Sequence, residues 1–229
     1  MPRNKQQAPP QQRKTTILVV DDHPIVLQGL SQLIGQQDDL LVCGLARDVP
    51  EAMMMIRELK PDLVIVDISL QQGNGIELIK KIRISYPSLA VLALSMHDES
   101  LYAERCLRAG ARGYIMKIEA TENIITAIHK VMRGQIYVSN EMAAKMVRKL
   151  VGLKPELGAP AVERLSDREL EVLALIGRGH GTRWIAERLH LSLKTIETYR
   201  AHIKKKLNLA DADELLQYAI QWSKDKNIL

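Results

Sequence analysis

The sequence predicts an α/β domain with a doubly wound, five-stranded parallel sheet, followed by a small all-α domain of four helices. Between residues 16 and 136, five short apolar runs alternate with amphipathic stretches, whereas beyond residue 160 the apolar pattern is helical. Runs that are apolar on both faces are typical of buried parallel strands. Five successive strand–helix units give an open sheet with helices on both faces. At 229 residues the chain is long enough for two domains.

The first domain, residues 16–136, alternates strands with helices. Its expected strands are 17–20, 41–45, 63–66, 91–94 and 113–116. The helices expected between and after them show apolar residues at helical spacing and cover 25–34, 49–59, 75–84, 101–109 and 122–133.

The second domain, residues 161–226, follows a linker at 137–160. Pro155, Gly158 and Pro160 interrupt a polar stretch there, and the amphipathic segment 140–150 before them predicts a linker helix. Helices are expected at 167–178, 182–189, 193–207 and 212–223. Ser166 and Glu169 have the spacing of a capping box at the first of these starts.

The composition of the chain indicates the cellular compartment in which the protein works. Residues 1–15 are rich in Gln and Pro, carry basic residues and lack the apolar segment of a signal peptide, so a disordered basic tail is expected. No apolar run approaches the roughly 20 residues of a membrane-spanning helix. We therefore expect a cytoplasmic protein with no membrane partner. Cys43 and Cys106 lie in separate apolar patterns and are expected to be buried, reduced thiols.

Charge is divided unevenly along the chain. The net charge is +5, yet residues 16–141 carry 12 Lys or Arg against 16 Asp or Glu, a net of −4. The positive excess lies in the tail, in 145–154 and around 194–206. An acidic first half and basic patches behind it indicate two separate functions, and a basic patch suits contact with a polyanion.

Five polar side chains follow four of the predicted strands. Asp21 and Asp22 follow the first strand, Asp67 the third, Ser95 the fourth and Lys117 the fifth. Ligands of doubly wound sheets bind at the carboxyl ends of the strands, so we expect these side chains at one edge. Three carboxylates suit Mg²⁺. One Asp alone would be interpreted as a helix cap or turn residue, but the joint placement favours a site.

These segments resemble the receiver domains of response regulators over about residues 16–134. The likeness rests on 17–24 (ILVVDDHP), Asp67, 93–95 (ALS) and 109–117 (AGARGYIMK), and it points to the NarL/FixJ group. It implies a flavodoxin-like receiver in which Asp67 accepts a phosphoryl group from a sensor histidine kinase. It further implies that Mg²⁺ is held by Asp21, Asp22, Asp67 and the backbone carbonyl of Ser69, and that the switch residues are Ser95, Tyr114 and Lys117.

Two points qualify the resemblance. Tyr114 could also be an ordinary half-buried strand aromatic. Receivers often have Met-Pro shortly after the phosphorylated Asp, whereas Leu70 and Gln71 follow Ser69 here. Gly73 and Gly75 still precede the next helix, so we expect altered loop dynamics and retained function.

The second domain resembles LuxR-type helix-turn-helix domains from about residue 160 to 222. The matching segments are 165–173 (LSDRELEVL), 185–189 (IAERL), 194–199 (KTIETY) and 206–207 (KL). In the helix at 193–207, the residues that share one face and are expected to pack on the domain are Ile196, Tyr199, Ile203 and Leu207. The remaining faces would enter the major groove of DNA. The candidate DNA contacts are Lys194, Thr195, Glu197, Thr198, Arg200, Ala201, Lys204 and Lys205.

Some alternatives stay open in this domain. The run 204–206 alone could be a solvated charged face. Glu197 could accept a hydrogen bond from cytosine but would repel phosphates. Trp184 stands where the family often has a charged residue, and it could serve the core, a partner or the DNA backbone. The last helix brings together four residues that serve either dimerisation, matching two-fold DNA sites, or the core: Leu215, Leu216, Ala219 and Ile220.

Taken together, these features predict a two-component response regulator that acts as a DNA-binding transcription factor and is not an enzyme. Phosphorylation would favour dimerisation and promoter binding, and RNA polymerase is a further candidate partner. In the resting state we expect the receiver to pack against the helical domain and to hide its recognition helix or its dimer surface. The alternatives are a metal-dependent phosphatase, a phosphorylation-independent regulator and a regulator gated by a small ligand.

Overall fold

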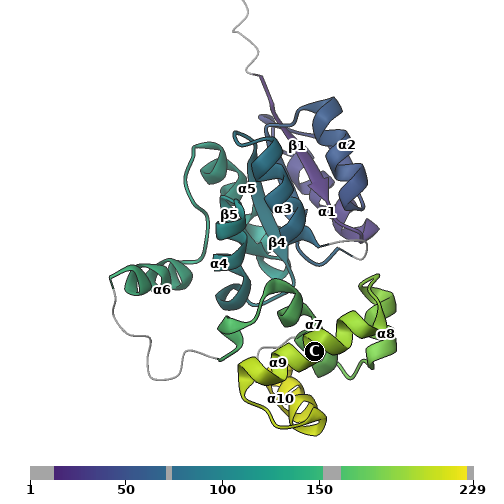
Figure 1. The fold of residues 1–229 in the computed structure, drawn as a ribbon. Coiled ribbons are helices and arrows are strands. Elements are labelled where there is room, and N and C mark those ends of the chain that lie inside the picture. The colour runs from purple at the N-terminus through teal and green to yellow at the C-terminus, as the bar shows by residue number, and fades with distance from the viewer. Residues whose placement is uncertain (1–12, 71–73, 152–160, 226–229) are drawn as a thin grey trace, which may run out of the picture.

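The computed structural model describes residues 13–70, 74–151 and 161–225. The expectations for the N-terminal tail up to residue 12, for Gln71 and Gly73, and for the prolines and glycine of the linker lie outside the described residues. Two domains are seen in Figure 1, a sheet domain and a helical domain.

The sheet domain has the predicted five parallel strands. They are β1 (Thr15–Val20), β2 (Leu40–Ala46), β3 (Leu63–Asp67), β4 (Ala90–Ser95) and β5 (Gly113–Met116). Their spatial order is β2-β1-β3-β4-β5, and every neighbouring pair is parallel. From β1 the chain first moves outward to β2 and then crosses back to β3. The strand order therefore reverses between β1 and β3, where ligands of such sheets bind.

Five helices cover the sheet, two on one face and three on the other, and both layers can be followed in Figure 1. The first face carries α1 (Pro24–Gly35) and α5 (Lys117–Met132), and the second carries α2 (Val49–Leu59), α3 (Gly75–Ser85) and α4 (Glu99–Ala109). Helix α5 begins at residue 117, five residues before its predicted start. Residues 117–121 contain no Gly or Pro to break a helix, so the helix starts directly after β5.

A separate helix, α6 (Asn140–Leu150), is the predicted linker helix, and it packs on α4 of the sheet domain. The backbone N–H of Ser139 donates to Glu99 Oε1 at 2.8 Å, and Lys149 Nζ lies 2.8 Å from Glu104 Oε2. The first half of the linker is thus attached to the sheet domain.

The helical domain contains a 3₁₀ turn, η1 (Ala161–Arg164), and the four predicted helices α7 (Asp167–Gly177), α8 (Thr182–Arg188), α9 (Leu193–Leu207) and α10 (Ala212–Asp225). The predicted capping box at Ser166 and Glu169 is formed. Helices α7 and α10 approach closely at Gly177, where an added Cβ would lie 2.5 Å from the carbonyl oxygen of Ala219. This position therefore requires glycine.

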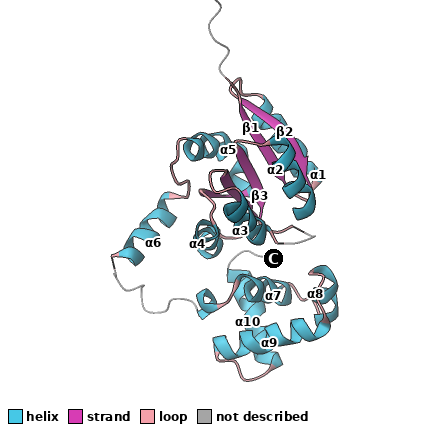
Figure 2. Ribbon diagram, turned by 45° about the horizontal axis from the view of Figure 1, so that its top comes forward, coloured by secondary structure: helices cyan, strands magenta, loops and turns pink. Residues whose placement is uncertain are grey.

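The two domains meet through α7. Figures 1 and 2 show α7 beneath α3 and α4, with α9 and α10 farther from the sheet. Buried apolar residues of the two domains form one continuous cluster. Among the described residues, none of the helices combines the length and apolar character needed to cross a membrane.

Candidate functional site

Three carboxylates and a lysine meet at the carboxyl ends of β1, β3 and β5. Asp21 directly follows β1, Asp67 is the last residue of β3, and both are completely buried. Lys117, the first residue of α5, places its Nζ 2.7 Å from Asp21 Oδ2 and 2.7 Å from Asp67 Oδ2. The topology thus brings together residues that are 46 and 50 positions apart in the sequence, as the strand pattern predicted.

Burial and charge together set the ionisation of this pocket. Burial raises the pKa of the Asp67 carboxyl, and the neighbouring Lys117 ammonium offsets only part of that effect. For Lys117, burial acts to lower the pKa, but the Asp67 and Asp21 carboxylates outweigh it, so the pKa is raised. Lys117 therefore remains a cation and compensates for part of the buried negative charge.

The same pocket fits a divalent cation. Ligand atoms of Asp21, Asp22, His23 and Asp67 all lie within 4.8 Å of one another. Within the described part of the chain, the buried Asp21 Oδ2 pairs with Lys117 Nζ and with no other donor. Carboxylate oxygens are the donors that Mg²⁺ prefers. His23 was not among the predicted site residues, and its Nδ1 lies 2.9 Å from Asp22 Oδ1 and 3.1 Å from Asp21 Oδ1.

The remaining predicted pocket residues are Ser69, just after β3, Ser95, at the end of β4, and Tyr114, within β5. The backbone N–H of Ser69 donates to Asp67 Oδ1 at 3.0 Å. Ser95 ends β4 and is completely buried, and its Oγ accepts a hydrogen bond from the backbone N–H of His97 at 2.9 Å. Tyr114 is buried at 1% exposure, and its hydroxyl donates to the carbonyl oxygen of His97 at 2.7 Å. Tyr114 is therefore buried and not half-buried, while its role as a switch residue or as an ordinary strand aromatic stays a prediction.

Helix α9 shows the predicted division into a packed and an exposed face. Ile196, Ile203 and Leu207 are buried, and Tyr199 is half-buried. Five of the candidate DNA-contacting residues are exposed, namely Lys194, Glu197, Thr198, Ala201 and Lys205. The other three, Thr195, Arg200 and Lys204, are half-buried. In the same basic run, Lys206 Nζ instead binds the buried Glu169 Oε2 at 2.6 Å, so this lysine joins α9 to α7.

The four apolar residues of α10 do not share one environment. Leu215 and Ala219 are completely buried and contribute to the core of the helical domain. Leu216 is 40% exposed and Ile220 is half-buried, so these two residues supply apolar surface on α10. Trp184 is also partly exposed, and its ring stacks on His180 with ring centroids 3.6 Å apart.

The arrangement defines a class of protein. A doubly wound sheet with a buried acidic pocket at its switch point, joined to a helical domain with an exposed basic helix, is the architecture of a response regulator that binds DNA.

Comparison with known proteins gives the family. Residues 17–129 match the response regulator receiver domain, and residues 163–219 match the bacterial regulatory proteins of the luxR family. The chain is 38% identical over 209 residues to the oxygen regulatory protein NreC of Staphylococcus carnosus (strain TM300), which covers 90% of this chain and 96% of that protein. The chain therefore belongs to the response regulators that combine a receiver domain with a LuxR-type DNA-binding domain.

Solved structures agree with this assignment. RcsB from Salmonella enterica serovar Typhimurium, bound to promoter rprA in the presence of the phosphomimetic BeF3−, is 27% identical with a TM-score of 0.65. The match covers 90% of this chain and 98% of that one. A structure of two RcsB dimers bound to two parallel DNAs also matches at 27% identity, with a TM-score of 0.56 and the same coverage.

Proposed function

We propose that Asp67 accepts a phosphoryl group from a sensor histidine kinase and that this modification favours dimerisation and promoter binding. The observation that carries the proposal is the position of Asp67, buried at the switch point of the sheet with Lys117 Nζ at 2.7 Å. A carboxylate oxygen of Asp67 would attack the phosphorus of a phosphohistidine. The new O–P bond would form as the N–P bond breaks, and the kinase imidazole would leave with the bonding pair and take up a proton.

We propose that the pocket holds Mg²⁺ through Asp21, Asp22, Asp67 and the backbone carbonyl of Ser69. The bound cation would supply charge neutralisation for the transferring phosphoryl group. His23 is a poorer candidate ligand, because Mg²⁺ prefers oxygen donors. The role we assign to His23 is to hold the two neighbouring carboxylates in place through its ring nitrogen and its backbone N–H.

The switch we propose acts through Ser95, Tyr114 and Lys117. Lys117 is already bound to Asp67, so it would remain with the phosphoryl oxygens after transfer. The Ser95 hydroxyl would turn from the backbone N–H of His97 to a phosphoryl oxygen. Because Tyr114 also bonds to His97, this rotation would disturb the segment that Tyr114 holds.

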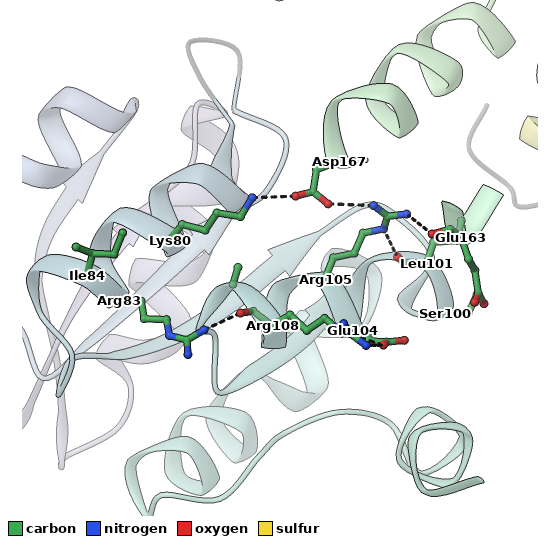
Figure 3. Close-up of a pocket in the computed structure, with 11 residues that line it drawn as sticks. Lys80, Arg83, Ile84, Ser100, Leu101, Glu104, Arg105, Arg108, Glu163 and Asp167 are labelled. Atoms are coloured by element: carbon green, nitrogen blue, oxygen red, sulfur yellow. Dashed lines mark hydrogen bonds and ion pairs between the residues drawn. The ribbon is translucent and has the colours of Figure 1, made fainter. Parts of the chain in front are cut away.

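The resting state we propose is the docked arrangement of the two domains. Asp167, at the start of α7, accepts hydrogen bonds from Lys80 Nζ at 3.2 Å and from an Arg105 guanidinium nitrogen at 3.0 Å (Figure 3). A third contact joins Asn74 Nδ2 to Glu171 Oε2 at 3.2 Å. The sequence predicts that docking hides the recognition helix or the dimer surface, but much of α9 is exposed, and so is Leu216 of α10. Docking would therefore restrain DNA binding without covering α9. The docked receiver would occupy space beside the helical domain and so limit how two helical domains approach one DNA site.

Loss of the Arg105 contact should release the helical domain. Arg105 and Asp167 line a cleft of about 670 Å³ that admits water, so solvent screens their attraction. We expect Arg105→Gln to weaken docking by about 1 kcal/mol, which corresponds to about fivefold in the equilibrium. Unphosphorylated Arg105→Gln should then bind a DNA duplex about fivefold more tightly than the unphosphorylated wild type in a fluorescence-anisotropy titration.

Arg108→Gln is the matched control for this prediction. Arg108 lies on the same helix, but it pairs with Glu104 of that helix, and its side chain is 75% exposed. The affinity of Arg108→Gln for DNA is expected to equal that of the wild type. An Arg105→Gln protein that binds no more tightly than Arg108→Gln would show that the contact does not restrain DNA binding.

We propose that the exposed faces of α9 bind DNA through Lys194, Thr195, Glu197, Thr198, Arg200, Ala201, Lys204 and Lys205. We expect Lys205→Ala to weaken binding about equally for all duplexes and to reduce the slope of log affinity against log salt by about 1. Lys224→Ala, at an exposed lysine of α10, is the control and should leave the slope unchanged. Equal slopes for wild type and Lys205→Ala would show that Lys205 does not contact DNA.

The dimer contact we propose on α10 uses Leu216 and Ile220, the pair that is not fully buried. The RcsB dimers bound to DNA support dimerisation itself, and the partly exposed apolar surface of α10 is the reason for placing the contact there. We assign residues 16–136 to the receiver, 137–160 to the linker and 161–226 to the DNA-binding domain, and the attachment of α6 to α4 supports a linker that moves partly with the receiver. The protein would encounter promoter DNA, the kinase and RNA polymerase in the cytoplasm.

A phosphoryl donor tests this function against its alternatives. With Mg²⁺ and acetyl phosphate, the wild type is expected to gain affinity for DNA. An unchanged affinity would favour a phosphorylation-independent or ligand-gated regulator. Sustained hydrolysis of small phosphoesters would favour a metal-dependent phosphatase and contradict our proposal that the protein is not an enzyme.

A further inference from the structure

His97, in the loop after β4, contacts two switch residues through its backbone. Its N–H donates to Ser95 Oγ at 2.9 Å, and its carbonyl oxygen accepts the Tyr114 hydroxyl at 2.7 Å. The predictions from sequence did not include this residue. A rotation of Ser95 would remove the acceptor of the His97 N–H, so the position of this loop depends on the state of the pocket.

The His97 side chain makes two further contacts, one with a residue of the phosphorylation pocket and one with helix α4. Its Nε2 lies 3.0 Å from Ser69 Oγ, two residues after the phosphoacceptor. Its ring stacks on Tyr102 of α4, with ring centroids 4.7 Å apart and an angle of 20° between the planes.

Tyr102 connects this ring to the domain boundary. Its side chain is 4% exposed, although it lies on the face of α4 that carries Arg105, three residues later. Tyr102 belongs to the buried apolar cluster that continues into α7. Two residues of α7, Asp167 and Glu171, bind the receiver through Lys80, Arg105 and Asn74. A displacement of the Tyr102 ring would thus occur directly beside the contacts that dock the helical domain.

We propose that His97 is a positioning residue that couples the phosphorylation pocket to the docking of α7. It acts through Ser69 and Ser95 on one side and through the stacked Tyr102 ring on the other. The proposal rests on the proposed function, because it needs Asp67 to be phosphorylated. Phosphorylation would draw the Ser95 hydroxyl away from the His97 N–H, move the imidazole, and loosen the Tyr102 ring against α7.

Two substitutions separate the two contacts of the ring. His97→Phe keeps an aromatic ring for Tyr102 but cannot hydrogen-bond to Ser69. His97→Gln keeps a polar group that can reach Ser69 but removes the stacked ring. The readout is the response ratio, defined as the Kd for a DNA duplex without acetyl phosphate and Mg²⁺ divided by the Kd with them. Each variant is expected to show a ratio roughly threefold to tenfold smaller than that of the wild type, the scale of one lost contact.

Second substitutions show whether each contact acts through His97. Ser69→Ala alone should lower the response ratio, yet it should have no further effect in His97→Phe, which already lacks that hydrogen bond. Likewise, Tyr102→Leu should have no further effect in His97→Gln. A side chain that only stabilised the fold would give additive effects instead.

Intact mass, measured in parallel, keeps this proposal distinct from the proposed function. Wild type that takes up no phosphoryl group refutes phosphorylation of Asp67, and the coupling proposal fails with it. Normal phosphoryl uptake with an unchanged response ratio in both His97 variants overturns the role of His97 alone. A wild-type ratio of 1 after normal uptake also overturns it, since there would be no coupling to transmit.

Discussion

Replacement of Asp67 by alanine is expected to abolish phosphoryl uptake and, with it, the increase in DNA affinity that phosphorylation produces. The alanine side chain has no oxygen to attack the phosphorus, and Lys117 retains Asp21 as its partner, so the fold should persist. Allosteric coupling of this kind commonly changes affinity by about 5- to 150-fold. Anisotropy titrations of a duplex with and without acetyl phosphate and Mg²⁺ should therefore give superimposable curves for Asp67→Ala and separate curves for wild type.

Asp38→Ala provides the control for this comparison. Asp38 is exposed and lies just before β2, at the opposite end of the strands from the pocket. It should respond to acetyl phosphate like the wild type. Wild type and Asp67→Ala that gain equal affinity after treatment would show that the response does not pass through Asp67.

Replacement of Lys117 by methionine is expected to lower the free energy of unfolding by about 3–5 kcal/mol at neutral pH, because it leaves two buried carboxylates without their cation. Asp21 and Asp67 are both fully buried, and Lys117 is the ammonium that bridges them. Urea denaturation of the two proteins measures this difference. Lys81→Met, at an exposed lysine of α3, should change it by no more than about 0.5 kcal/mol.

The pH dependence of the Lys117→Met defect has a definite sign. Burial already raises the pKa of Asp67 in the folded protein, and loss of Lys117 should raise that pKa further. A carboxyl with a raised folded pKa binds its proton more tightly in the folded state, so its destabilising effect is absent below the unfolded pKa of about 4 and grows as the pH rises. The defect should therefore shrink on acidification, and Mg²⁺ should reduce it at neutral pH. A defect that is constant with pH would contradict this account.

The sheet and the acidic pocket were accessible from the sequence because parallel strands impose a simple geometry. Each strand contains an apolar run, so the end of the run is visible as the first polar residue after it, and all the carboxyl ends meet at one edge. Asp21, Asp67 and Lys117 therefore meet as the pattern predicted, and Ser95 ends the strand next to β3. The start of α5 was misplaced because no capping residue marks it; Met116 occupies the N-cap without a side-chain hydrogen bond.

The contacts of His97 and Asp167 could not be predicted in the same way. Asp167 was recognisable as a first-turn residue of α7, where an acidic side chain suits the helix dipole. Its pairing with Lys80 and Arg105 depends on how the two domains meet, and no local pattern in the sequence encodes that. The hydrogen bond of His97 to Ser69 depends in turn on the loops after β3 and β4. The only signal for these contacts in the sequence was a histidine two residues after Ser95.

The most direct test of the central claim is the intact mass of the wild-type protein after incubation with Mg²⁺ and acetyl phosphate, followed by peptide mapping of any modified residue. Our account predicts one added phosphoryl group, located on Asp67 and absent from Asp67→Ala. A correctly folded wild type that keeps its unmodified mass, or that carries the phosphoryl group on another residue, would contradict it.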